Sequence, residues 1–154
     1  MTDTVHGGSA ETRPLIMDIG TGVVAGLAGG LVFGALMAVM AMLPMIGMLV
    51  GSESAVAGFG VHMVISAVIG AIYGGAVHVL GLSPAYRLVS GIGIGLTYGV
   101  IWWILGPLLI MPTMMGMGPQ VGSALSQMNV MSLIGHLMFG ATAGAAFALL
   151  SDRR

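Results

Sequence analysis

Four long apolar stretches, almost free of charge, constrain the fold of this chain more than any other feature. They span residues 23–43, 58–80, 88–110 and 130–150. About 20 apolar residues cross the hydrocarbon core of a bilayer as a helix. Lipid offers no hydrogen-bond partner to the backbone, so each stretch must satisfy its own N–H and C=O groups. Charged residues make up only 6% of the chain, against roughly 25% in soluble domains. The pattern predicts an all-α membrane protein with four transmembrane helices.

The second half of the sequence repeats the landmarks of the first half in the same order. Each half contains a helix with glycine at every fourth position, then the motif M-x-x-M-x-G-M at 42–48 or 111–117, then a helix that carries a histidine. Self-similarity of this kind indicates repeated architecture. We therefore expect two tandem helical hairpins, about 20–80 and about 88–150, related by a pseudo-twofold axis along the membrane normal. The glycines that recur in this way are Gly22, Gly26, Gly30, Gly34, Gly91, Gly95 and Gly99.

These glycine stripes also predict how the helices pack. Small residues at every fourth position let two membrane helices approach closely. The stripes should therefore hold a tight four-helix bundle together. Any stripe left exposed would suit docking to another membrane helix or to a second copy of the chain.

The basic residues predict the orientation of the chain in the membrane. Arg13 precedes the first expected span, Arg87 lies between the second and third, and Arg153 and Arg154 follow the fourth. The positive-inside rule then places both termini and the Arg87 loop on the cytoplasmic side of the membrane. Residues 1–18 are expected to form a flexible cytoplasmic tail, and 19–154 the four-span membrane domain. The two methionine-rich loops would face outward.

Several classes of function are disfavoured by what the sequence lacks. No Asp, Glu, Lys or Arg falls inside an expected span, which argues against an ion-driven transporter. The chain has no cysteine, so it has no disulfide, thiolate site or cysteine nucleophile. The net charge of −1 gives no basis for binding nucleic acid.

The methionines give the sharpest chemical signal. Only Met1 and Met17 fall on the expected cytoplasmic side, whereas all the others lie in the outer loops or the outer halves of the spans. Thioether sulfur selects Cu(I), and imidazole also binds copper. The alternative is that methionine merely fills irregular turns at the membrane edge, because its side chain is flexible and apolar. The candidate copper ligands are His62, His136 and the motif methionines Met42, Met45, Met48, Met111, Met114 and Met117.

The two span histidines support other hypotheses as well. His62 and His136 are expected at matching depth, and two histidines on facing helices can hold haem axially. They can equally be buried side chains that bond a nearby carbonyl or hydroxyl. His62 and Ser66 are one helical turn apart, as a base and a nucleophile would be. No carboxylate is available inside the spans to orient the histidine, so we do not expect an enzyme.

The region from His62 to the C-terminus resembles the YagU-like family of small bacterial inner-membrane proteins. The similarity comprises His62, Ser66 and Tyr73, the short turn before Gly91, and then Pro112, Met115-Gly116, Gly135-His136-Leu137 and the basic C-terminal end. It implies a multi-span inner-membrane protein with no assigned chemistry, and it makes His136 a family feature. It assigns no catalytic or metal-binding role.

From the sequence we expect a non-enzymatic membrane component that serves as an accessory, assembly or helix-docking subunit. Its partners would be the lipid bilayer and either a second copy or a larger membrane protein. The leading alternative is an outward-facing Cu(I)-handling protein, and the third is a bis-histidine haem protein. The identity of any cofactor is left open between copper, haem and none.

Overall fold

The computed structural model describes residues 13–152, and this part of the chain is helical with no β-strand. Four helices are each long and apolar enough to cross a membrane, which confirms that part of the predicted fold. Residues 1–12 of the expected tail, and Arg153 and Arg154, lie outside the described residues. The long helices are α1 (Leu15–Val39), α3 (Ala55–Val79), α4 (Leu88–Trp103) with its continuation, and α6 (Gln127–Asp152).

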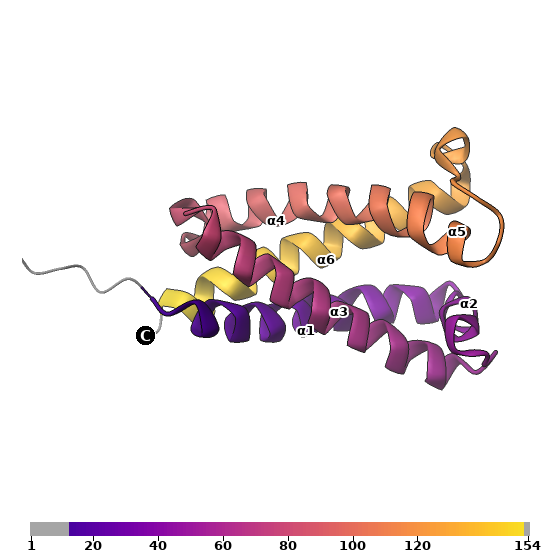
Figure 1. Ribbon diagram of the computed structural model, residues 1–154, viewed down its shortest axis with the longest axis horizontal. Coiled ribbons are helices and arrows are strands. Elements are labelled where there is room, and N and C mark those ends of the chain that lie inside the picture. The colour runs from indigo at the N-terminus through magenta and orange to yellow at the C-terminus, as the bar shows by residue number, and fades with distance from the viewer. Residues whose placement is uncertain (1–12, 153–154) are drawn as a thin grey trace, which may run out of the picture.

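The helix α4 continues without a break into η3 (Ile104–Ile110) and α5 (Met111–Met114). Short elements connect the long helices at the two ends of the bundle (Figure 1). One end, which we call the methionine end, holds α5 and both M-x-x-M-x-G-M motifs. The opposite end, where α1 begins and α6 finishes, we call the Asp18 end. The short elements are α2 (Leu43–Gly47), η1 (Met48–Val50), η2 (Ser83–Tyr86) and η4 (Val121–Ser123).

Helix α1 begins earlier than the sequence predicted. Its first residue is Leu15, directly after Pro14, whose φ of −63° and ψ of 139° end the extended segment before the helix. Residues 15–18, which were assigned to the flexible tail, therefore form the first turn of a long helix. The boundary at residue 18 was wrong, because the prediction treated the polar Asp18 as outside the membrane domain.

Three helices end in the same left-handed turn. Gly81 after α3 and Gly116 after α5 have positive φ values, and so does Ala41 after α1. The residue that follows each one donates its N–H to a carbonyl five residues earlier, for example Leu82 to Val77 at 2.9 Å. This bond satisfies carbonyls that a helix end would otherwise leave unpaired. Ala41, with φ of 54°, lacks the freedom that glycine has in this region.

Within each hairpin the helix backbones are in direct contact. A side chain at Gly22 or Gly26 of α1 would collide with the backbone of Gly70 in α3. In the second hairpin, a side chain at Gly95 of α4 would collide with the backbone of Gly140 in α6. The glycine stripes are therefore buried in the helix contacts within the hairpins α1–α3 and α4–α6. The stripe glycines Gly22, Gly26, Gly95 and Gly99 are therefore not left exposed for docking to another helix.

The two hairpins meet mainly through α1 and α6, which lie side by side in the middle of the bundle. Phe33 of α1 occupies the space above Gly135 of α6, and Phe139 of α6 lies against Gly29 of α1. In contrast, α3 reaches α4 through long side chains, such as the Tyr98 hydroxyl, which donates to the Ile69 carbonyl at 2.7 Å. Between the hairpins, the backbones of α1 and α6 come close where Gly29 meets the Phe139 carbonyl, whereas α3 and α4 meet through side chains.

Candidate functional site: a methionine-lined cavity and a buried charge cluster

A large cavity lies between the two hairpins at the methionine end. Its volume is about 740 Å³, within the range of about 300–1,000 Å³ typical of ligand pockets. Residues of α1, α3 and α6, together with the α4–η3–α5 helix and both end loops, form its walls. Met114, Met117 and Met128 line it and are 67%, 58% and 60% exposed. The cavity is therefore open at this end, and its inner wall includes the buried Ser66 and Phe139.

The cavity brings together most of the candidate metal ligands. Met48 is the exception, because it lies outside the lining and is 44% exposed. It begins η1, in which the next residue, Leu49, does line the cavity. The predicted residues that line the cavity are His62, His136, Met42, Met45, Met111, Met114 and Met117.

Three further methionines that we had not selected also line the cavity: Met37, Met115 and Met128. Met37 lies one helical turn beyond Phe33 in α1 and is 4% exposed. Helical spacing from Phe33 would have indicated the shared face. Met115 and Met128 fall outside the invariant positions of the repeat motif, so a search based on the repeat could not identify them.

Both histidines are held in one orientation by a backbone carbonyl. His62 Nε2 lies 2.9 Å from the Gly30 carbonyl oxygen, and His136 Nδ1 lies 2.8 Å from the Ser132 carbonyl oxygen. A carbonyl only accepts, so these ring nitrogens carry the protons and donate. In a neutral imidazole the other nitrogen then bears a free lone pair. Metal-binding histidines commonly have this arrangement, with the second ring N–H bonded to a carbonyl.

The bonds of His62 also bear on the predicted base–nucleophile pair. His62 donates to Gly30 rather than engaging the Ser66 hydroxyl, which instead packs where a side chain of Gly30 would lie. The pair is thus not arranged for proton transfer between His62 and Ser66.

Phe33 links the two histidines. Its ring centroid lies 5.4 Å from that of His62 and 4.8 Å from that of His136, edge-on in both cases. The two imidazoles therefore sit near each other across one aromatic ring. A porphyrin placed between them would require Phe33 to move, whereas ligands approaching from the cavity would not.

The wall next to His136 has an unusual backbone. The segment Ile104–Ile110 is a π-helix with Pro107 inside it. Proline lacks the N–H that a helix needs, and π-helical turns often mark functional sites. A side chain at Gly106 would place its Cβ 3.9 Å from His136 Nε2. The π-helix therefore presents a glycine to the free nitrogen of His136 and keeps that nitrogen accessible.

The chemistry of the lining suits a soft metal ion better than a hard one. Among residues 13–152, no group of three or more His, Asp or Glu side chains is arranged to hold a metal. Beside neutral amide and hydroxyl groups such as Gln120, Asn129 and Ser132, the lining includes thioethers and two imidazoles with free lone pairs. Such donors prefer Cu(I) to Mg²⁺, Ca²⁺ or Mn²⁺.

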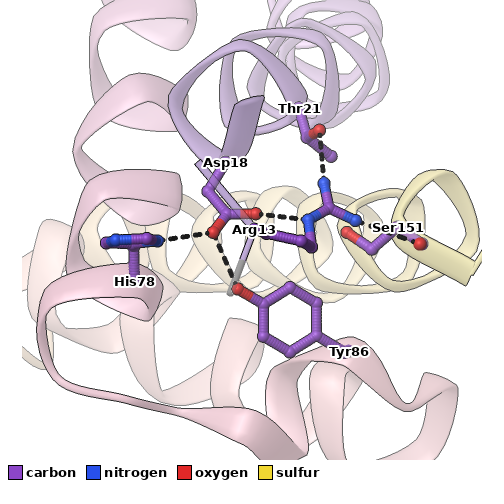
Figure 2. Close-up of polar contacts among 6 residues, drawn as sticks. All are labelled: Arg13, Asp18, Thr21, His78, Tyr86 and Ser151. Atoms are coloured by element: carbon purple, nitrogen blue, oxygen red, sulfur yellow. Dashed lines mark hydrogen bonds and ion pairs between the residues drawn. The ribbon is translucent and has the colours of Figure 1, made fainter. Parts of the chain in front are cut away.

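A second polar site, which the sequence analysis missed, lies at the Asp18 end (Figure 2). Asp18 in the first turn of α1 is 0% exposed. Its carboxylate accepts from Tyr86 at 2.8 Å, contacts His78 Nδ1 at 2.9 Å and pairs with Arg13 Nε at 3.0 Å. An acidic side chain therefore lies within a membrane-length helix. The statement that no ionisable acid lies in a span was wrong, because Asp18 was excluded from the first span.

Arg13 connects this cluster to the second hairpin. Its guanidinium donates to the Ser151 carbonyl of α6 at 3.0 Å and to the Thr21 hydroxyl at 3.3 Å. It also lies over the Tyr86 ring, 5.5 Å from the centroid. We call Arg13, Asp18, His78 and Tyr86 the Asp18 cluster. It joins α1, α3, η2 and α6 at one end of the bundle.

Tyr86, in the connection between α3 and α4, acts as a donor in this cluster. Burial, together with the hydrogen bond to Asp18, raises the pKa of Tyr86 to about 12. The phenol therefore keeps its proton at physiological pH. It stabilises the Asp18 carboxylate without adding a second negative charge.

Comparison with known proteins identifies no relative. No family model matches the chain, and neither a curated protein nor a solved structure is similar to it. The function must therefore be argued from the cavity and the Asp18 cluster themselves.

Proposed function

We propose that this chain is a non-enzymatic membrane protein that binds Cu(I) in the cavity at the methionine end. The observation that carries the proposal is the convergence of five motif methionines and both span histidines on one cavity. These residues come from two distant parts of the sequence. Their carbonyl-fixed imidazoles supply neutral nitrogen ligands, and the methionines supply soft sulfur.

The cellular setting of the proposal comes from the sequence. We place the protein in a bacterial inner membrane, with both termini cytoplasmic and the cavity open outward. Arg13 and Arg87 lie at the same end of the bundle, next to α1 and α4, which supports this orientation. We further propose that the hairpins are tandem repeats related by a pseudo-twofold axis. The glycine contacts α1–α3 and α4–α6 support it.

The test is copper content and affinity in detergent-purified protein kept under reducing conditions. Wild-type protein should bind Cu(I) near stoichiometrically and compete with a chromogenic chelator. Met45→Leu combined with Met114→Leu should weaken binding by more than about tenfold, because two soft ligands are lost. Met48→Leu is the matched control, since Met48 belongs to the same motif but lies outside the cavity lining. Equal copper binding by all three proteins would refute the site.

The histidines are tested in the same assay. His62→Ala with His136→Ala should also lower the Cu(I) affinity, whereas His78→Gln should leave it unchanged because His78 lies at the Asp18 end. Copper retained fully by the double variant would remove both imidazoles from the proposed ligand set.

Haem remains the second candidate, because the cavity volume of about 740 Å³ suits an organic ligand as well as an ion. It predicts a Soret band, iron in place of copper and loss of both in either His→Ala variant. The absence of both metals from protein prepared under copper- and haem-replete conditions would favour the accessory-subunit alternative. That alternative would rest on copurifying partners, since the glycine stripes are not exposed.

A further inference from the structure

The two hairpins have the properties of rigid bodies. Backbone contact at Gly22, Gly26 and Gly70 holds α1 to α3, and contact at Gly95 and Gly140 holds α4 to α6. Such close contacts cannot slide or separate without losing most of the packing between the two helices. Between the hairpins, α1 meets α6 at the backbone contact of Gly29 with Phe139, whereas α3 meets α4 through side chains, which can take new rotamers at smaller cost. Relative motion should therefore occur between the hairpins rather than within them.

The two ends of the interface between hairpins differ in structure. At the methionine end the hairpins enclose the open cavity. At the Asp18 end the cluster closes the interface, because Arg13 bonds Ser151 of α6 while Asp18 bonds Tyr86 and His78. Figure 1 shows the same difference, with the α3 ribbon diverging from α4 toward the methionine end.

A ladder of aromatic rings connects the cavity with the Asp18 cluster. Trp102 lines the cavity and lies 6.1 Å from Tyr98 between ring centroids. Tyr98 is 5.0 Å from Tyr73, Tyr73 is 5.3 Å from Phe147, and Phe147 is 5.6 Å from Tyr86. The ladder runs from one site to the other and includes residues of both hairpins. It fills the path that a ligand would take from the cavity to the Asp18 end.

Two members of the ladder, Tyr73 and Trp102, each have a buried polar atom without a hydrogen-bond partner among the described residues. Tyr73 is 2% exposed, and its hydroxyl finds no hydrogen-bond partner among the described residues. A buried hydroxyl without a partner is unfavourable, and such groups call for an explanation. Opening of the ladder to water would give this hydroxyl a partner, which lowers the cost of the open state.

We propose that this chain is an alternating-access carrier in which the hairpins rock about the α1–α6 contact. In the state described here the cavity opens at the methionine end, and the aromatic ladder and the Asp18 cluster close the other end. In the second state the cluster separates, the ladder parts and the cavity opens at the Asp18 end. Rocking of one half of a bundle against the other around a fixed central site is the usual physical basis of such transport.

The carried ligand is the one that the cavity binds, so this inference rests on the copper site proposed above for the identity of the cargo. The conformational change itself can be measured without copper. If the protein binds no Cu(I) but access to the cavity changes, the protein is a carrier of a different ligand. Copper binding together with fixed access would leave a binding protein that does not carry.

The absence of cysteine from the sequence makes access directly measurable. Ile69→Cys places a single thiol in the cavity wall, at a residue whose backbone carbonyl accepts from Tyr98. Met114→Cys and Leu80→Cys mark the methionine end and the Asp18 end, and both native residues are 67% exposed. Each single-cysteine protein is reconstituted in vesicles and treated with a membrane-impermeant maleimide from one side at a time.

With an intact cluster, the thiol of Ile69→Cys should react with maleimide from the side that labels Met114→Cys. It should react slowly from the side that labels Leu80→Cys. Adding Asp18→Asn removes the charge that holds the cluster. The thiol of Ile69→Cys should then be labelled more than about tenfold faster from the side that labels Leu80→Cys, because the ligand-free equilibrium shifts toward the second state. Thr97→Val is the control, since its hydroxyl bonds only within α4, to Gly93.

If Asp18→Asn does not fold, variants that disturb the cluster less can replace it in the labelling assay. Tyr86→Phe and His78→Gln each remove one contact of Asp18 and leave the ion pair with Arg13. A rise in labelling from the Asp18 side in any folded cluster variant supports the carrier. Labelling that stays confined to the methionine side in all folded variants overturns it and makes the cluster a static tie. Equal labelling from both sides with the cluster intact also overturns it.

Discussion

Asp18 offers the most direct test of the energetics of this fold. Its carboxylate is 0% exposed and has three partners at 2.8–3.0 Å, and the side chains of Arg13 and His78 are 24% and 30% exposed. Removing one partner of a buried pair typically costs about 3–5 kcal/mol, because the other charge is left uncompensated. Asp18→Ala should therefore destabilise the protein by about that amount. Asp18→Asn should cost about 1–3 kcal/mol, since its amide oxygen still accepts from Tyr86.

The assay is equilibrium unfolding of the purified protein in mixed micelles, followed by circular dichroism, on the wild type, Asp18→Asn, Arg13→Gln and the double variant. The cycle isolates the interaction between the two residues. Each single variant already breaks the ion pair, so the double variant loses that interaction only once. The double variant should therefore be more stable than the sum of the two single effects implies, with a coupling free energy above about 1 kcal/mol. Additive effects, or a cost for Asp18→Ala below about 0.5 kcal/mol, would refute the view that the cluster holds the Asp18 end together.

Three further substitutions test the packing, the helix ends and the cavity. Gly95→Ala should destabilise the protein by about 1–3 kcal/mol through overpacking against α6. In the same unfolding assay Gly93→Ala, whose added methyl group meets open space, should be neutral or stabilising. Equal effects of the two substitutions would contradict backbone contact between α4 and α6. Ala41→Gly should raise the melting temperature, because it relieves a φ of 54° that costs a residue with a side chain about 1 kcal/mol; a lower melting temperature would speak against that turn. Gly106→Val should weaken Cu(I) binding about tenfold in chelator competition, because it crowds the free nitrogen of His136 and leaves its other bonds intact; an unchanged affinity would exclude that nitrogen as a ligand.

The sequence predicts the four long helices because lipid leaves so few alternatives. Each apolar stretch had to become a helix, and the glycine spacing identified the faces that meet, such as Gly95 against Gly140. It did not predict which helix lies next to which between the hairpins. That arrangement depends on the fit of Phe33 over Gly135, and side-chain fit between distant segments leaves no periodic signal.

The two functional sites differ in how far the sequence revealed them. Five of the eight methionines that line the cavity were found because the repeat marked them, although the repeat also selected Met48, which lies outside the lining. The Asp18 cluster was missed because Asp18 was assigned to the polar tail, outside the first span, where the cost of a charge in lipid does not arise. That cost applies to an unpaired charge, and here Arg13, His78 and Tyr86 compensate it. The signal was available in Arg13, five residues before Asp18, and in His78 near the end of the helix that packs against α1. An acid flanked by apolar residues at the start of a span is therefore better interpreted by searching for its partners than by moving the helix boundary past it.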